Sequence, residues 1–192
     1  MNMSILDMIK NAFKSAAKDA VKDAAKKAQN PSVSFKFDTL PATLDELKAL
    51  PEASLDTPYK AAALTVCALN AYMDDPDTGI EMLNFLKGPQ PLTPREKQFL
   101  KDRRDYQKYV AISYFAGAKP ENDYTPDVPY VLSVSANPYS FNEEKYATLW
   151  LTSGGADSPR QVKLRAKGDQ WFLWEHMLLP GIRKTKSEDP WA

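Results

Sequence analysis

Residues 161–176 read QVKLRAKGDQWFLWEH, and this stretch decides the fold. Two runs of strand-forming residues, 161–166 and 171–176, flank Lys167-Gly168-Asp169, in which the glycine is free to take a positive φ. The stretch therefore predicts a tight antiparallel hairpin. Because residues 171–174 (WFLW) are apolar on both faces, we expect the second strand to lie at the centre of a sheet or to be covered on both sides.

Further strands are indicated upstream of this hairpin, where the period of apolar residues changes from helical to alternating near residue 110. Residues 110–115, 130–135 and 146–152 predict three strands. The last of these alternates clearly, with Ala147, Leu149 and Leu151 on one face. Short connections favour antiparallel pairing, so we expect a sheet of four or five antiparallel strands.

Helical patterns precede the strands. Residues 57–74 predict the central helix, because the run from 61 to 69 is apolar almost without interruption. A second helix is expected to begin with Asp77 as its N-cap and to end at Gly88, and a third opens at Thr93 and turns Phe99 and Leu100 inward. The predicted class is α+β, with these helices packed on the sheet.

Residues 31–56 are interpreted as a linker that docks on the core. Thr43 and Glu46 have the spacing of a capping box, which predicts one short helix inside this linker. Together with the helices and strands that follow, the segment completes a single α+β domain over residues 31–192.

The first thirty residues predict a separate amphipathic helix. Residues 4–29 contain no Gly or Pro, and a stripe of lysines lies opposite a mostly alanine face. Large apolar side chains concentrate in its first turns. We expect this extension to bind a protein partner or a second copy of the chain, with contact to a membrane surface as the alternative, through Ile5, Leu6, Ile9 and Phe13.

Composition narrows the function classes. Lys plus Arg equals Asp plus Glu at 25 each, so the chain as a whole offers no field that attracts nucleic acid, and no nucleic-acid partner is expected. The single cysteine, Cys67, excludes an internal disulfide and fits a reducing compartment. With no signal peptide and no apolar run long enough to span a bilayer, a cytoplasmic location is expected.

Catalytic and metal-binding patterns do not emerge from the sequence. The one histidine, His176, follows Glu175 in a strand, so the two side chains point to opposite faces and cannot cooperate directly. Gly154-Gly155 lies between two strands, which indicates a flexible connection and not a phosphate-binding loop. We therefore expect no cofactor and no metal site, and the sequence leans towards a protein that is not an enzyme.

Two hypotheses about function remain open. The first is a noncatalytic binding or adaptor module that attaches through residues 4–29. The second is a small-molecule binder or enzyme that uses an aromatic-lined face of the sheet, since aromatic residues crowd the second half of the chain. Packing in the core is the other explanation for those aromatic residues. The candidate ligand-binding residues are Tyr146, Trp150, Arg165 and Glu175.

Several short motifs together carry a resemblance to a known family. The longest runs from residue 155 to residue 183 and includes GADSPR, QWFLWE and GIR; FDTLP at 37–41, YFAGA at 114–118 and NPY at 137–139 add to it. These motifs resemble an uncharacterised bacterial family, domain of unknown function 6935. The resemblance covers roughly residues 35–192 and brings no assigned activity. More loosely, helices followed by a curved sheet are similar to the nuclear transport factor 2 and cystatin-like folds, a likeness of fold only.

Overall fold

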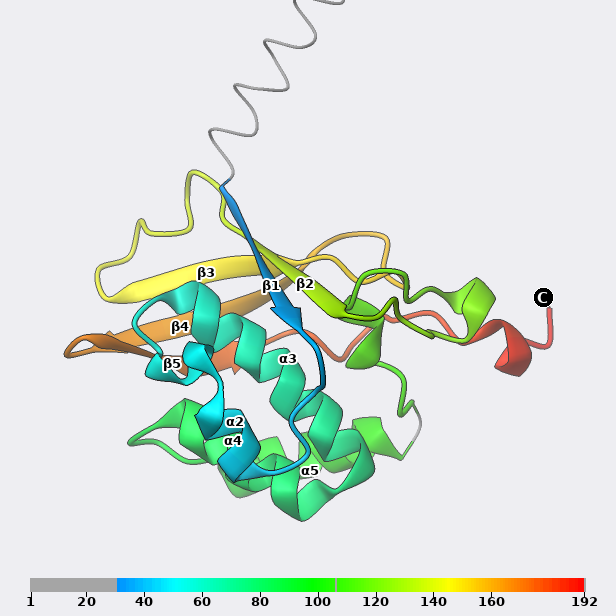
Figure 1. Cartoon of the computed structure of the whole chain (residues 1–192), viewed down its shortest axis with the longest axis horizontal. Helices are drawn as coiled ribbons and strands as arrows, with labels where there is room; N and C mark the ends of the chain where they lie inside the picture. Colours follow the sequence, from blue (N-terminus) through cyan, green and yellow to red (C-terminus); the bar gives the residue numbers. More distant parts are fainter. Residues whose placement is uncertain (1–30, 106, 192) are drawn as a thin grey trace, which may run out of the picture.

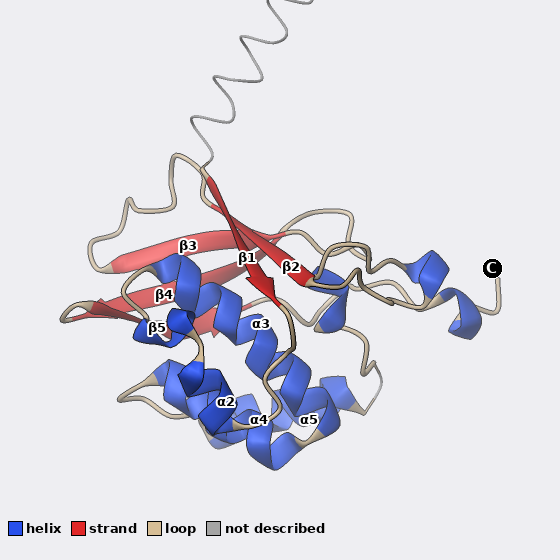
Figure 2. Ribbon diagram, in the orientation of Figure 1, coloured by secondary structure: helices blue, strands red, loops and turns tan. Residues whose placement is uncertain are grey.

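The computed structural model describes residues 31–105 and 107–191. Its framework is an antiparallel sheet in the order β1-β2-β3-β4-β5, so every strand pairs with its neighbours in the sequence (Figure 1). The strands are β1 (Ser32–Phe37), β2 (Tyr130–Ser135), β3 (Tyr146–Leu151), β4 (Arg160–Lys167) and β5 (Gln170–His176). The helices gather on one side of this sheet (Figure 2). The described chain is thus an α+β fold, as the sequence predicts.

The helical layer contains α2 (Leu44–Ala49), α3 (Pro58–Asp74), α4 (Pro76–Lys87) and α5 (Pro94–Arg104). Helix α3 lies against the sheet as predicted for the central helix, and most of its side chains are buried. It begins at Pro58, where the Thr57 hydroxyl accepts a hydrogen bond from the Lys60 N–H. Short 3₁₀ helices occur at Pro51–Ser54, Ile112–Tyr114, Pro120–Asn122 and Lys186–Glu188.

The two faces of the sheet differ in chemistry. Ala147, Leu149 and Leu151 of β3 are buried against the helices, together with Val162 and Leu164 of β4. The opposite face of the same strands carries polar and aromatic side chains that are half-buried or exposed, among them Tyr146, Trp150, Lys163 and Arg165. This outer face is the part of the sheet that the helices leave open.

The prediction for residues 110–115 is wrong, and the fifth strand comes from elsewhere. These residues form turns and a 3₁₀ helix, in which Val110, Ala111, Tyr114 and Phe115 are buried. Buried residues three and four positions apart are typical of a helical backbone, although the order of apolar and polar residues in this segment also resembles the alternation of a strand. The missing strand is β1, inside the segment predicted as a linker, which pairs with β2 along its full length.

The tryptophan-bearing strand β5 lies at the edge of the sheet and not at its centre. Its free edge is covered locally, because the Trp171 N–H donates to the Leu55 carbonyl at 2.8 Å and the Trp174 carbonyl accepts from Lys87 at 3.2 Å. The expected central position is therefore wrong, and its alternative, cover on both faces, describes β5 better: Leu173 is buried on one face, and on the other the Phe172 ring packs against Gly88.

Three helix details also differ from prediction. Asp75, and not Asp77, caps α4: its carboxylate accepts hydrogen bonds from the N–H groups of Asp77 and Thr78. Leu100 of α5 is buried as expected, but Phe99 is exposed. At α2, Thr43 accepts from the Glu46 N–H, while the Glu46 carboxylate accepts from Ala42, so the capping box is incomplete.

Gly154 and Gly155 are packed, which corrects their interpretation as a flexible connection. A Cβ atom on Gly154 would lie 1.9 Å from the Ala118 carbonyl oxygen, and one on Gly155 would lie 1.9 Å from the Tyr124 hydroxyl. The glycines are present because neighbouring groups approach their Cα atoms closely.

Candidate functional site

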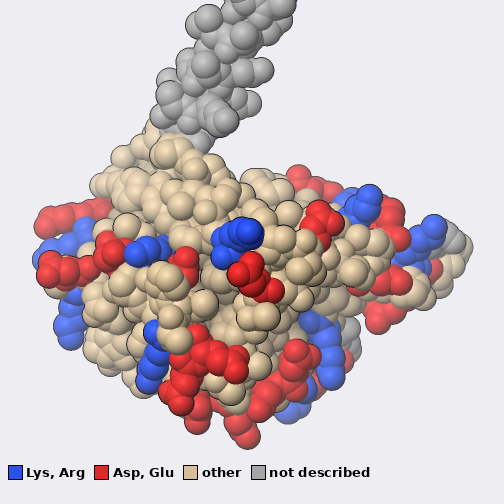
Figure 3. Space-filling model, in the orientation of Figure 1, with Lys and Arg blue, Asp and Glu red and all other residues tan. Residues whose placement is uncertain are grey.

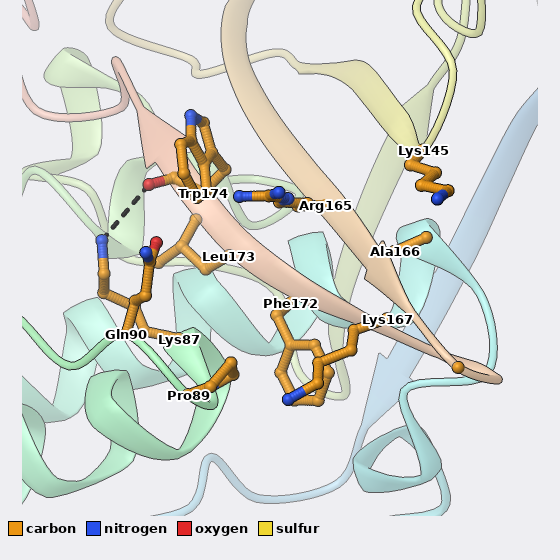
Figure 4. Close-up of a pocket in the computed structure, with 11 residues that line it drawn as sticks. Lys87, Pro89, Gln90, Lys145, Arg165, Ala166, Lys167, Phe172, Leu173 and Trp174 are labelled. Atoms are coloured by element: carbon orange, nitrogen blue, oxygen red, sulfur yellow. Dashed lines mark hydrogen bonds between the residues drawn. The ribbon is translucent and has the colours of Figure 1, made fainter.

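A cavity of about 580 Å³ opens beside β5, between the β4–β5 hairpin and the corner that joins α4 to α5. Figure 4 shows its lining residues, which come from α4 and the turn after it, from the residue before β3, and from β4 and β5. Its charged side chains are all basic: Lys87, Lys145, Arg165 and Lys167. Its apolar lining residues include Phe172, Trp174 and Pro89. We call this cavity the basic pocket.

Local backbone geometry brings α4 close to β5. Gly88 ends α4 with φ of +58°, and a Cβ atom at this position would lie 2.4 Å from the ring of Phe172. Glycine therefore meets two requirements at once, a left-handed backbone and close approach to an aromatic ring. Pro89 follows and prevents the helix from continuing, so the chain turns beside the pocket.

Arg165 contacts two aromatic rings on the outer face of the sheet. Its guanidinium carbon lies 4.7 Å from the centre of the Trp174 ring and 5.4 Å from that of Tyr146. The two rings also contact each other edge to face, with centres 5.7 Å apart. The rings limit the orientations of the guanidinium, while its N–H groups remain accessible because the side chain is exposed.

Lys87 is the one buried cation of the basic pocket. Its Nζ lies 2.6 Å from Oε1 of Glu96 and donates a second hydrogen bond to the Trp174 carbonyl. Burial alone would raise the pKa of Glu96, but hydrogen bonds from Lys87 and Thr93 outweigh it and lower that pKa. Glu96 also completes a capping box with Thr93 at the start of α5. Lys87 is thereby fixed in position at one end of the pocket.

His176 lies behind the pocket, at a smaller cavity of about 110 Å³ that Lys87, Glu96 and Trp174 also line. Burial and the nearby charge of Lys87 lower its pKa to about 4, with Glu96 acting in the opposite direction. Its Nδ1 accepts a hydrogen bond from the Leu178 N–H at 3.4 Å. Near pH 7 the imidazole is therefore neutral.

The structure brings together only some of the residues predicted for a ligand site. Tyr146 contacts Arg165 as described above. Glu175 pairs with Lys163 across β4 and β5 and is not part of the pocket lining. Trp150 lies at a different, shallower cavity with Met177 and Pro180. The contact residues predicted for the N-terminal helix, Ile5, Leu6, Ile9 and Phe13, lie outside the described residues.

Sequence reasoning missed Lys87, Lys145, Lys167 and Phe172 as pocket residues. The spacing of Arg165 and Lys167 was a usable signal, because residues two apart in a strand share a face. Lys87 had no comparable signal, since it reaches the pocket from a helix far away in the sequence.

Charge elsewhere on the molecule is mixed. Figure 3 shows acidic and basic side chains interspersed over the face it presents, in line with the zero net charge. Among residues 31–105 and 107–191, no group of three or more His, Cys, Asp or Glu side chains is placed to hold a metal ion. No helix in these same ranges is long and apolar enough to cross a bilayer.

Comparison with known proteins gives one family and no close relative of known function. No curated protein and no solved structure matches the chain significantly. The model of the family described as Domain of unknown function (DUF6935) matches residues 39–186, which include β2 to β5, all four described α-helices and every residue of the basic pocket. The chain therefore belongs to this domain of unknown function family, DUF6935.

Proposed function

We propose that the protein is a noncatalytic binding module and that the basic pocket holds a small anionic molecule with a flat apolar body. The observation that carries the proposal is the charge of the lining, which contains four cationic side chains and no acidic one; of the four, Lys87 is paired with Glu96, which lies outside the lining. A volume of about 580 Å³ falls within the range of small-molecule sites, roughly 300–1,000 Å³.

Three of the four cations remain available to a ligand. Within the part of the chain that the structure describes, no carboxylate forms an ion pair with Arg165, Lys145 or Lys167. Lys163 differs, because Glu143 lies 2.7 Å from its Nζ. An anion in the pocket would neutralise these three side chains, which have no acidic partner among the described residues.

Preorganisation of Arg165 favours binding. Each cation–π contact at an exposed site contributes about 0.5–1 kcal/mol, so Tyr146 and Trp174 together restrict the guanidinium before a ligand arrives. A side chain that is already ordered loses less conformational entropy on binding. Phe172 and Pro89 offer apolar surface beside it for the body of the ligand.

Isothermal titration calorimetry with two matched probes tests the proposal. Naphthalene-2-sulfonate carries a flat body and one negative charge, whereas naphthalene-2-sulfonamide has the same body without the charge. We expect the sulfonate to bind and the sulfonamide to bind at least about tenfold more weakly, since a hydrogen bond to a charged group contributes about 1.5–3 kcal/mol.

Paired variants locate the binding. Arg165→Met removes a charge inside the pocket, and Lys36→Met removes one from exposed β1 at the opposite edge of the sheet. The first should weaken sulfonate binding and the second should leave it unchanged. Equal affinity of the two probes, or equal effects of the two variants, would contradict the proposal.

The attachment role of residues 4–29 stays part of the proposal, as does a location in the cytoplasm. The location is supported by Cys67, whose thiol is free and buried in α3. Attachment is tested by deleting residues 1–30 and measuring association with proteins of a native lysate and with liposomes. Association that persists after the deletion would contradict it.

A further inference from the structure

We infer that the anionic group recognised in the basic pocket is a phosphate monoester, bound by Arg165 together with Lys145 and Lys167. The inference rests on the proposed function and makes its ligand class specific. Three observations support it: the closeness of the three cations along the chain backbone, the lack of neutralising carboxylates, and the orientation of Arg165.

The three cations leave the sheet from neighbouring backbone positions. Arg165 and Lys167 are two residues apart in β4, so they share a face and their Cα atoms are about 6.6 Å apart. Between them, the Ala166 N–H donates to the Lys145 carbonyl at 2.8 Å, which places Lys145 beside the same segment. All three residues belong to the lining of the pocket. In Figure 4 the Arg165 side chain points towards Trp174, and Lys145 lies on the other side of β4.

Among the described residues, the three unpaired cations carry more positive charge than a single negative charge can neutralise. A carboxylate or sulfonate carries one negative charge, whereas a phosphate monoester carries about −1.5 to −2 near pH 7. Lys163, the next cation on the same face of β4, is already neutralised by Glu143. A dianion therefore matches Arg165, Lys145 and Lys167 better than a monoanion does.

Arg165 can also recognise the shape of the anionic group, because its N–H groups are directional. Contacts with Trp174 and Tyr146 restrict the guanidinium, and its N–H groups remain accessible because the side chain is exposed. These N–H groups form a fork that pairs with two oxygens of one phosphate, which the single ammonium of a lysine cannot do. Arg165 is thus the residue that orients the anionic group, and Tyr146 is a positioning residue.

The test compares 2-naphthyl phosphate with naphthalene-2-sulfonate by calorimetry at pH 7.5, on the full chain. The bodies are the same and the head groups differ in charge. We expect the phosphate to bind at least about fivefold more tightly, the effect of roughly one additional screened charge contact. Its affinity should fall as pH drops from 7.5 to 5, because the second pKa of the phosphate is about 6, while sulfonate affinity stays level.

Variants separate charge from shape. Arg165→Lys retains the charge and loses the fork, so we expect it to weaken the binding of phosphate and sulfonate alike. Lys167→Met removes one of the three charges, and we expect it to remove the preference for phosphate. Tyr146→Leu should weaken phosphate binding without changing its pH profile. Lys36→Met, at the opposite edge of the sheet, is the matched control and should leave the preference intact.

The outcomes are distinct from those of the proposed function. Sulfonate binding without a phosphate preference, or a preference that survives Lys167→Met, would overturn the phosphate inference and leave the binding module standing. Failure of both probes would overturn both. Sedimentation with phosphatidylcholine vesicles that contain phosphatidic acid identifies a lipid as the source of the phosphate, and binding of the soluble ester alone identifies a free metabolite.

Discussion

The Nζ of Lys87 lies 2.6 Å from Oε1 of Glu96, and the two side chains differ sharply in exposure. The lysine side chain is 8% exposed, whereas that of the glutamate is 38% exposed. Their contact ties the end of α4 to the first turn of α5, and Lys87 extends the link to β5 through the Trp174 carbonyl. If the pair is broken, water can hydrogen-bond to the partly exposed carboxylate of Glu96, whereas the ammonium of Lys87 is buried and has little access to water.

This asymmetry predicts unequal effects of breaking the pair. Glu96→Gln leaves the charge of Lys87 buried and poorly compensated, so we expect it to lower the free energy of unfolding by about 3 kcal/mol. Lys87→Met removes the buried charge and leaves Glu96 partly solvated, at an expected loss of about 1 kcal/mol. Urea unfolding of the two variants measures the difference. A larger loss for Lys87→Met would show that burial of the lysine does not control this contact.

Acid should destabilise the fold through His176. Its pKa is about 4 in the folded chain against an ordinary 6.5, so between these values the unfolded chain binds a proton that the folded chain does not. Stability therefore falls as pH drops from about 6.5 to 4, by at most about 1.4 kcal/mol per pH unit from this group. The lowered pKa of Glu96 acts in the same direction, at lower pH.

Urea unfolding at pH 7, 6 and 5 checks this prediction in wild type and in His176→Gln. The wild-type protein should lose stability over this interval, and the variant should lose clearly less. Parallel profiles would mean that the imidazole is protonated equally readily in the folded and unfolded states.

Substitution of Gly154 or Gly155 should lower the free energy of unfolding because the new side chain clashes with neighbouring groups, and not because the backbone needs a glycine conformation. In Gly154→Ala the new Cβ meets the rigid Ala118 carbonyl, and we expect a loss of about 3 kcal/mol or more. Gly168→Ala provides the comparison, because that glycine has φ of +59° and open space around it, so only about 1 kcal/mol is expected. Thermal or urea unfolding ranks the two, and the reverse order would refute the packing explanation.

Truncation from the N-terminus should show where the fold begins. Deleting residues 1–30 keeps Pro31, whose carbonyl accepts a hydrogen bond from Ala136, and we expect cooperative unfolding to be retained. Deleting residues 1–37 also removes β1, with buried Phe35 and Phe37, and should leave the chain without a cooperative transition. Circular dichroism during thermal unfolding distinguishes these results. Similar transitions in both truncations would show that β1 is dispensable.

Local patterns in the sequence were enough to predict much of the fold. The α3 and α5 helices follow from apolar spacing together with Thr57, Thr93 and the prolines after them. Strands β2 to β5 follow from alternation and from the Gly168 turn. These elements are stabilised by their own residues and near neighbours, so short-range reasoning suffices for them.

The errors occur where distant segments decide the structure. The segment of β1 was read as a linker because its partner, β2, lies almost a hundred residues away. The edge position of β5 was hidden because Leu55 and Lys87, both remote in sequence, cover it. The basic pocket has the same origin: Arg165 was identified from its strand, but Lys87 and Lys145 join it only through tertiary contacts.

The most direct test of the anion site is a proton–nitrogen NMR titration with naphthalene-2-sulfonate that follows the indole N–H signals. Trp174 lines the basic pocket, whereas Trp150 lies at a separate cavity and serves as an internal control. We expect a saturable shift of the signals of the Trp174 indole and the Arg165 side chain, and no shift of the Trp150 signal. No shift at Trp174, or one centred on Trp150, would contradict it.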